Sequence, residues 1–407
     1  MKILLAHNRY QLPGGEDEVY RRELEMLVDH GHEVIEYTRD NREIAQYGVG
    51  GKATLAVRTT WAWDTYRQLG AILAKAKPDV AHFHNTFPLV SPAAYYACKA
   101  AGIPVVQTLH NYRLLCPAAT FMRNSAPCED CLDKSLVHSI RYGCYRQSRF
   151  STVPVAAMLA IHRGLRTYTR LINRYITPSE FTREKFIKSG ISAENIVVKP
   201  NFVERDPGRG LHAHGYALFV GRLAPEKGLS ILLQAWKCHK NAPLHILGDG
   251  VLRKQLETDA TSLGLSCIKF IGLLERNEVY KQMKEARVLI FPSQWYETFG
   301  MTIIEAYACG LPVIASRLGV MQEIVHDGQT GLHFTPGDAD DLARKVEWAW
   351  AHPDEMRKMG QNARAEYEAN YTAERNYKML IDVYQQAIVE ARQPLMSRDP
   401  KVLGVAD

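Results

Sequence analysis

Residues 290–316, IFPSQWYETFGMTIIEAYACGLPVIAS, contain the elements from which the fold can be inferred. We expect a strand over 289–291, a loop, a helix over 302–308 and a second strand over 312–316. Gly310 stands where a helix end favours a left-handed residue, and a proline follows where a helix cannot continue. A strand, a helix and a strand in this order are typical of an α/β protein with a parallel sheet.

Two carboxylates lie within this stretch, Glu297 in the loop and Glu305 inside the helix. The helix start is marked by Phe299, Gly300 and Met301. A helix N-terminus offers unpaired N–H groups and partial positive charge, which suit an anion or a ring of hydroxyls. Ionised glutamate accepts hydrogen bonds from sugar hydroxyls. The stretch therefore indicates a sugar-nucleotide site, although two glutamates alone are more often solvated surface residues.

The wider motif identifies a family. After Glu297 come Thr-Phe-Gly-Met, then Ile-Ile-Glu-Ala and Cys-Gly-Leu-Pro-Val-Ile-Ala-Ser. This run resembles the donor-site signature of retaining glycosyltransferases of family 4, which adopt the GT-B fold of two Rossmann-like domains facing across a cleft. The run Gly-Arg-Leu-Ala-Pro-Glu-Lys-Gly at 221–228 resembles the same family. The resemblance implies that its Arg222 and Lys227 hold the donor's diphosphate, as cations suited to a leaving phosphate.

The length and composition of the chain indicate which class of protein it is. The chain has 407 residues, 46% hydrophobic and 23% charged, as expected for a globular protein with room for two domains. No stretch reaches the length of a membrane span, and the N-terminus is too short and too soon polar for a signal peptide. We therefore expect cytoplasmic residence, in which the eight cysteines are reduced thiols or metal ligands.

Strand and helix patterns alternate along both halves of the chain, which predicts two doubly wound α/β domains. The first domain is predicted at 1–205 and the second at 206–374, separated within the polar, Gly- and Pro-containing run 204–210. A final helix, about 375–391, would cross back to the first domain in this fold. The predicted strands are 3–7, 33–37, 80–83, 105–109, 174–177 and 196–199, then 217–220, 244–247, 268–271, 288–291, 313–315 and 331–334. Ligands of such sheets bind beyond the carboxyl ends of the strands, so a cleft between the domains is the expected site.

Two strand ends of the first domain carry candidate donor contacts. Gly14 and Gly15 precede a helical pattern and would allow backbone to approach a phosphate closely, although a Gly-Gly pair is more often just a turn. No G-x-G-x-x-G follows, which argues against a nicotinamide-binding domain. His110 ends another strand, and could donate to a sugar hydroxyl. The family commonly has His-Asp there, whereas this chain has His110-Asn111.

Four cysteines lie in a segment with few other structural signals: Cys116, Cys128, Cys131 and Cys144. The C-x-x-C spacing of the middle pair, with a cysteine on either side, could close a tetrahedral structural zinc site. Reduced thiols, some of them buried, are the alternative, and an iron–sulfur cluster would use the same ligands.

A basic run extends over 134–179, with eight Lys or Arg residues and no acidic residue. Its second half, 153–175, places Met158, Leu159, Leu165 and Leu171 among arginines, as a basic helix bound to a membrane surface would. A lipid-linked acceptor at the cytoplasmic face of a membrane would explain this charge. A partly buried helix kept soluble by its arginines is the alternative. We find no nucleic-acid-binding motif.

The sequence as a whole predicts a retaining, metal-independent glycosyltransferase that needs no cofactor for catalysis. It would move a sugar from a nucleotide diphosphate to an acceptor hydroxyl in bacterial cell-surface polysaccharide or glycolipid assembly. By resemblance, Glu305 holds the ribose, Glu297 the sugar hydroxyls, the 299–301 backbone the sugar and phosphate, and His110 lies near the reacting carbon. A sugar-nucleotide epimerase with the same fold and a non-catalytic binding subunit are alternatives. The epimerase would need acid and base carboxylates at the sugar, and the binding subunit would be expected to lack some of these residues.

Overall fold

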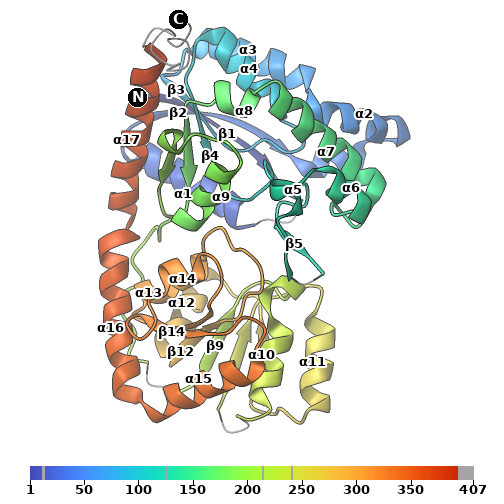
Figure 1. Cartoon of the computed structure of the whole chain (residues 1–407). Helices are drawn as coiled ribbons and strands as arrows, with labels where there is room; N and C mark the ends of the chain where they lie inside the picture. Colours follow the sequence, from blue (N-terminus) through green and yellow to red (C-terminus); the bar gives the residue numbers. More distant parts are fainter. Residues whose placement is uncertain (12–13, 125, 213–214, 240–241, 393–407) are drawn as a thin grey trace, which may run out of the picture.

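The computed structural model describes residues 1–11, 14–124, 126–212, 215–239 and 242–392. Two six-stranded sheets form its framework, one from each half of the described chain (Figure 1). Neighbouring strands within both sheets run parallel. The α/β fold class predicted from the alternating pattern is therefore confirmed.

The first sheet has the strand order β2–β1–β3–β4–β7–β8. Its strands are β1 (Lys2–Arg9), β2 (Glu33–Asp40), β3 (Val80–Asn85), β4 (Val105–Thr108), β7 (Arg174–Thr177) and β8 (Ile196–Val198). A short hairpin, β5 (Met122–Arg123) and β6 (Ala126–Pro127), follows β4. The helices of this half are α1 (Gly15–Asp29), α2 (Val49–Thr60), α3 (Trp63–Ala76), α4 (Ala93–Ala101), α5 (Asp130–Asp133), α6 (Val137–Tyr142), α7 (Arg149–Gly164), α8 (Thr167–Arg170) and α9 (Glu180–Lys188).

The second sheet has the strand order β11–β10–β9–β12–β13–β14. Its strands are β9 (Ala217–Val220), β10 (Leu244–Leu247), β11 (Ile268–Gly272), β12 (Val288–Phe291), β13 (Val313–Ser316) and β14 (Gly331–Phe334). Its helices are α10 (Leu229–Trp236), α11 (Arg253–Ser262), α12 (Arg276–Glu285), α13 (Met301–Ala308), α14 (Met321–Ile324), α15 (Ala339–Ala351) and α16 (Pro353–Asn370). The motif that led to the fold prediction is thus β12, α13 and β13, within a residue or so of the predicted bounds.

Helices cover both faces of the second sheet, which is why its central strand β12 is buried along its whole length. Successive side chains of a strand point to opposite faces. Leu289 accordingly belongs to a core cluster with Ile304 of α13, whereas Ile290 belongs to a different cluster with Trp236 of α10. A continuous apolar run therefore fills two cores at once.

The last helix connects the two halves. α16 lies along the second half of the molecule, and α17 (Ala373–Arg392) continues beside the first sheet (Figure 1). There α17 contacts β3, β4 and β7, with Leu380 and Tyr384 fully buried. The Tyr384 hydroxyl lies 2.8 Å from Nδ1 of His82, a fully buried histidine of β3.

The basic surface helix predicted over 153–175 is wrong in its bounds and in its apolar face. α7 ends at Gly164, and β7 begins at Arg174. Met158, Leu159 and Leu171 are buried in the core of the first half. Packing against the sheet removes these side chains from the surface because burial of apolar area dominates folding. In the part of the chain that the structure describes, no helix has the length and hydrophobicity needed to cross a bilayer.

Neighbouring strand ends approach so closely that one glycine should be hard to replace. Gly248 follows β10 with a φ of +127°, and an added Cβ would overlap the Gly221 carbonyl oxygen. We expect Gly248→Ala to lower the free energy of unfolding by about 3 kcal/mol, at the upper end for strained backbone positions. Gly264 is the matched control, because its φ is also positive but an added Cβ meets nothing. Gly264→Ala should cost about 1 kcal/mol in the same urea titration. Equal losses in the two variants would contradict the overlap.

Candidate active site

A cavity of about 590 Å³ lies between the two halves and is lined by residues from both. The structure brings together at this cavity most of the residues predicted from the sequence to bind the donor. From the first half they are Gly14, Gly15 and His110, and from the second half Arg222, Lys227, Glu297, Phe299, Gly300 and Met301. Glu305 does not line it.

Sheet topology explains the convergence. Gly14 follows β1, His110 follows β4, Arg222 follows β9, and the loop with Glu297 follows β12. Parallel strands end at the same edge of their sheet, so loops that are distant in sequence meet there. Hydrogen bonds between the halves support the arrangement, since the Thr298 hydroxyl donates to the His110 carbonyl at 2.9 Å.

Both predicted cations are paired with carboxylates of the second half. Nζ of Lys227 lies 2.5 Å from Oε1 of Glu297, which also accepts a hydrogen bond from the Ser293 hydroxyl at 2.8 Å. The Arg222 guanidinium lies 2.5 Å from Glu226 and its side chain is 61% exposed. Lys227 and Glu297 are therefore held beside each other at the cavity, while Arg222 is on its open side.

The N-terminus of α13 faces the same cavity. Gly300 is the N-cap residue, with a φ of +140° that favours glycine, and Met301 and Thr302 begin the helix and line the cavity. N–H groups of a first helical turn have no partners within the helix. The cavity thus combines unpaired donors, a helix dipole, a lysine and a carboxylate, which can bind a phosphate and a polyol together.

Glu305 lies on α13 but has a partner that the sequence did not predict. Its Oε1 lies 3.0 Å from Nη2 of Arg22, a buried arginine of α1. Arg22 also donates to the Phe202 carbonyl at 2.8 Å and to Glu18 at 2.9 Å. Glu305 therefore takes part in a bridge between the halves, next to the cavity rather than on its wall.

Glu16 is a wall residue that the sequence analysis missed. Burial and the neighbouring charge of Asp17 raise the pKa of Glu16 to about 8, so this carboxyl is mostly protonated at neutral pH. Asn111 donates a hydrogen bond from Nδ2 to Glu16 at 3.0 Å. This contact explains the departure from the family's His-Asp pair, because an aspartate at 111 would set a second carboxyl against Glu16. The only signal in the sequence that Glu16 belongs to the site was its position directly after Gly14 and Gly15.

The glycine loop is anchored by Asp17. The Gly14 N–H donates to Oδ2 of Asp17 at 2.8 Å, and Oδ1 of Asp17 lies 2.9 Å from Nε2 of His7. Because the Gly14 N–H is already engaged, a phosphate at this loop would have to use other N–H groups of the first turn of α1.

Behind His110 lies a chain of buried polar groups. Nε2 of His110 is 2.9 Å from Nδ1 of His84, and Nε2 of His84 is 3.4 Å from Oε2 of Glu23. The other oxygen of Glu23 is 2.7 Å from Nζ of Lys199. Burial alone would raise the pKa of Glu23, but the Lys199 ammonium and His84 hold it well below its ordinary value. Burial and the neighbouring His84 lower the pKa of His110, so His110 is neutral.

The contact between the two histidines joins Nδ1 of His84 to Nε2 of His110, so one ring donates and the other accepts. Nε2 of His110 is therefore engaged, and its Nδ1 is the ring atom that remains for a sugar hydroxyl.

One group of buried side chains has the spacing of metal ligands. Among the described residues, Glu23, His82 and His84 are the only group of three or more His, Cys, Asp or Glu with all ligand atoms within 4.8 Å of one another. Lys199 already supplies the positive charge that Glu23 requires, at 2.7 Å. We interpret the group as a buried ion-pair network. The four cysteines lie elsewhere, around a cavity of about 10 Å³.

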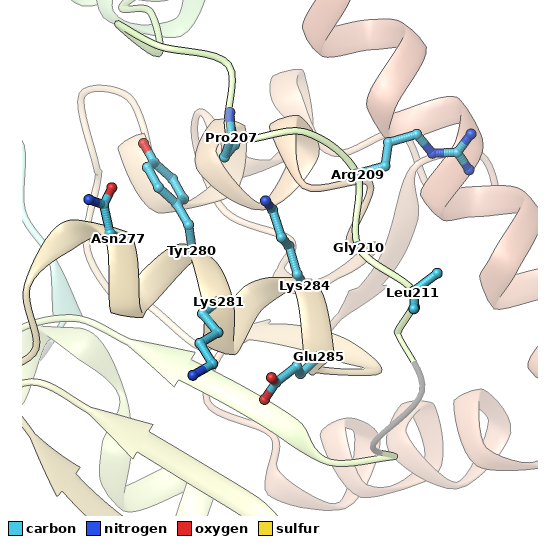
Figure 2. Close-up of a pocket in the computed structure, with 9 residues that line it drawn as sticks. All are labelled: Pro207, Arg209, Gly210, Leu211, Asn277, Tyr280, Lys281, Lys284 and Glu285. Atoms are coloured by element: carbon cyan, nitrogen blue, oxygen red, sulfur yellow. The ribbon is translucent and has the colours of Figure 1, made fainter.

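A second hollow of similar size contains none of the predicted site residues. It measures about 570 Å³ and lies between the linker residues Pro207 to Leu211 and α12 (Figure 2). Lys281, Lys284 and Glu285 of α12 contribute to its wall, as does Arg209, whose guanidinium points toward the last helices. It lacks the combination of helix N-terminus, cation and carboxylate that the cleft cavity offers.

Two family models match the chain in succession. One, described as Glycosyltransferase Family 4, matches residues 13–206, and the other, Glycosyl transferases group 1, matches residues 211–366. The chain belongs to glycosyltransferase family 4. The two models divide this family-4 chain between its two sheets, and the resemblance noted in the sequence is confirmed.

Two curated relatives match part of this family-4 chain. The D-rhamnosyltransferase WbpZ of Pseudomonas aeruginosa is 32% identical over 160 residues, 39% of this chain and 42% of the relative. The O-antigen chain mannosyltransferase C of Escherichia coli is 29% identical over 171 residues, 42% of this chain and 46% of the relative. The matches therefore span about half the length of these relatives.

A solved structure matches nearly the whole chain. The crystal structure of Anabaena HepE in complex with UDP has a TM-score of 0.69 to this chain at 20% identity. The match covers 95% of this chain and 100% of HepE. It shows that the fold is GT-B, as the sequence predicted.

The buried Glu23–Lys199 pair gives a test of the network behind His110. We expect Glu23→Leu to lower the free energy of unfolding by roughly 3–5 kcal/mol, because it leaves the Lys199 ammonium buried without a counter-charge. The double variant Glu23→Leu/Lys199→Met should recover a large part of that loss. Urea unfolding of the wild type and both variants measures the coupling. A single variant as stable as the wild type would show that the pair is not formed.

Proposed function

We propose that this chain is a retaining glycosyltransferase that moves a sugar from a nucleoside diphosphate sugar to an acceptor hydroxyl. The observation that carries the proposal is the convergence of Lys227, Glu297 and the N-terminus of α13 on one cavity between two sheets. A diphosphate needs cations and N–H donors, and a sugar needs acceptors, and here they lie side by side.

The donor would replace the ion pairs that Lys227 and Arg222 make with Glu297 and Glu226. Its diphosphate would bind Lys227, Arg222 and the first N–H groups of α13. Glu297 would then accept from the sugar hydroxyls, remaining bonded to Ser293 at 2.8 Å. Side chains alone can stabilise the leaving charge in this way, so we propose that transfer requires no metal or other cofactor.

The reaction would proceed on one face of the sugar without an enzymic nucleophile. The bond from the anomeric carbon to the leaving phosphate oxygen breaks, and the bond from that carbon to the acceptor oxygen forms on the same face. The acceptor's proton passes to the leaving phosphate. His110 would hold a sugar hydroxyl near the reacting carbon through Nδ1, the ring nitrogen that is not bonded to His84, and so position the ring.

Glu305 is proposed to hold the ribose hydroxyls. The bond from Arg22 to Oε1, at 3.0 Å, fixes the carboxylate and allows the second oxygen to accept. Donor binding at Glu305 would then act directly on a bridge between the two halves of the molecule.

The proposed acceptor is lipid-linked, at the cytoplasmic face of a membrane, in surface polysaccharide or glycolipid assembly. The E. coli relative named as an O-antigen chain mannosyltransferase supports the polysaccharide class. Support for a membrane surface comes from the outer side of α7, which exposes Phe150 by 92% and Leu165 by 58%, with Val153 and Ile161 between them. Spacings of three, four and eight residues place these side chains on one helical face.

Exposed arginines flank this apolar stripe, although only two of the four arginines within 153–175 are among them. Arg149, Arg166 and Arg170 are exposed. Arg163 instead donates to the Leu114 and Leu115 carbonyls, and Arg174 pairs with Glu390. Adjacent helices α2 and α6 pack on α7 and add exposed apolar residues at Val57 and Val137. An apolar stripe edged by arginines suits an anionic lipid surface.

The donor-site proposal predicts that removing the charge of Lys227 strongly lowers the rate of transfer. Lys227→Ala should lower kcat/KM roughly a hundredfold, which corresponds to about 3 kcal/mol of lost leaving-group stabilisation. A panel of nucleotide sugars, with donor hydrolysis or transfer as readout, identifies the substrate and measures the loss. Lys237→Ala, at an exposed lysine after α10, is the charge-matched control and should leave the rate unchanged.

Near-normal rates in Lys227→Ala would refute the assignment of the site. Product analysis with donor alone separates the alternative, because an epimerase releases a rearranged sugar without any acceptor.

The membrane proposal predicts reversible, salt-sensitive binding to anionic vesicles. Wild-type chain should sediment with phosphatidylglycerol-containing liposomes at low salt and be released at high salt, since each arginine contributes about 1 kcal/mol. The variant Arg149→Gln/Arg166→Gln/Arg170→Gln should stay in the supernatant, and Phe150→Ser should bind more weakly.

The matched control is Lys254→Gln/Lys269→Gln, which removes exposed positive charge from the second half of the chain. This control should sediment like the wild type. A wild type that remains in the supernatant at low salt would eliminate the proposed attachment.

A further inference from the structure

The segment between β4 and α7 has little regular structure to hold it. It contains the short hairpin β5–β6 and the helices α5 and α6, of four and six residues. Helices and hairpins of this size are not stable by themselves. The same segment carries the cysteines Cys116, Cys128, Cys131 and Cys144, which the proposed transfer does not use.

The fold gathers these four cysteines from separate parts of the segment. Cys128 follows the hairpin, and its N–H donates to the Phe121 carbonyl at 2.6 Å. Cys131 lies in α5, one helical turn further on. The N–H of Cys116 donates to the Tyr112 carbonyl at 2.8 Å, which closes a turn. Cys144 follows the end of α6. All four line one cavity of about 10 Å³.

The thiols are free rather than joined in disulfides. A cavity of this size accommodates a single atom or ion. A soft divalent ion of tetrahedral preference is the ligand that four thiolates select.

We propose that Cys116, Cys128, Cys131 and Cys144 bind one structural zinc ion. Zn–S bonds of about 2.3 Å place the sulfurs of a tetrahedral site about 3.8 Å apart. The four sulfurs surround a common cavity but are less compact than this, because no three of them fall among the ligand groups with atoms within 4.8 Å. Binding would therefore draw the segment inward.

Nearby arginines suit the charge of such a site. Zinc with four thiolates carries a net charge of about −2. Arg113, Arg123 and Arg163 all lie close enough to these thiols to act on them electrostatically. Arg163 also donates to the carbonyls of Leu114 and Leu115, next to Cys116. This explains an arginine of the basic run that does not face solvent.

The zinc site would support one wall of the cleft without taking part in the reaction. Ala119 and Thr120, between the first two cysteines, line the donor cavity. The Tyr112 hydroxyl lies 3.4 Å from the Glu297 carbonyl across the cleft. Zinc at the cysteines would hold these residues in place, as a structural metal does for a segment without a large core.

Metal content of the purified full-length chain tests the proposal directly. Chain produced in zinc-supplemented medium and dialysed into metal-free buffer should contain about one zinc per chain by mass spectrometry of the elements. A mercurial reagent should release that zinc as it modifies the thiols. Cobalt substitution should give the visible bands of a tetrahedral thiolate site.

Variants locate the metal. Cys128→Ser/Cys131→Ser should reduce zinc content roughly tenfold or more. The control Cys238→Ser/Cys267→Ser changes two cysteines of the second half and should leave it unchanged. Wild-type chain without zinc, with iron in its place or with these thiols in disulfides, would overturn the proposal, as would unchanged zinc in Cys128→Ser/Cys131→Ser. Metal content is read without any assay of transfer, so this outcome is independent of the proposed activity.

Discussion

The buried guanidinium of Arg22 connects the two halves of the molecule beside the cleft. Arg22 lies on α1, directly after the first strand, and its side chain bonds both to the Phe202 carbonyl and to Glu305 of α13. Leaving this charge without partners would be costly because it is removed from water. This contact ties α13, and hence its N-terminus at the cavity, to the first half of the molecule, together with the hydrogen bond from the Thr298 hydroxyl to the His110 carbonyl.

The charges of the cleft are already paired with one another. Lys227 bonds Glu297, Arg222 bonds Glu226, and Glu305 bonds Arg22. Such pairing lowers the desolvation penalty that isolated charges would carry in a partly buried cleft. The proposed donor can take the place of the first two pairings, since its phosphates offer an anion to Lys227 and Arg222 and its hydroxyls offer a donor to Glu297, while the bond between Arg22 and Glu305 remains. Preformed pairs would in this way keep the site organised before the donor arrives.

Asn111 illustrates how one residue can be understood only from its neighbours. In sequence it is a departure from the family's His-Asp pair, and its consequence could not be judged. In the structure it donates to Glu16, whose pKa is raised to about 8 by burial and by Asp17. Glu16 lies 95 positions away along the chain, so only the meeting of two strand ends reveals the pair.

The sequence by itself determined the α/β class, the strands, the family and nine of the residues that line the cavity. Local patterns suffice for these because β-branched runs, a helix-ending glycine and contiguous motifs act over a few residues. Tertiary structure alone decided the partners: Arg22 for Glu305, His84 and Glu23 behind His110, and Glu297 for Lys227. It also decided which residues of the basic run face solvent, burying Met158 and Leu159 and leaving Phe150 exposed. Hydrogen bonds and burial depend on distances between segments far apart in sequence, and no local pattern contains those distances.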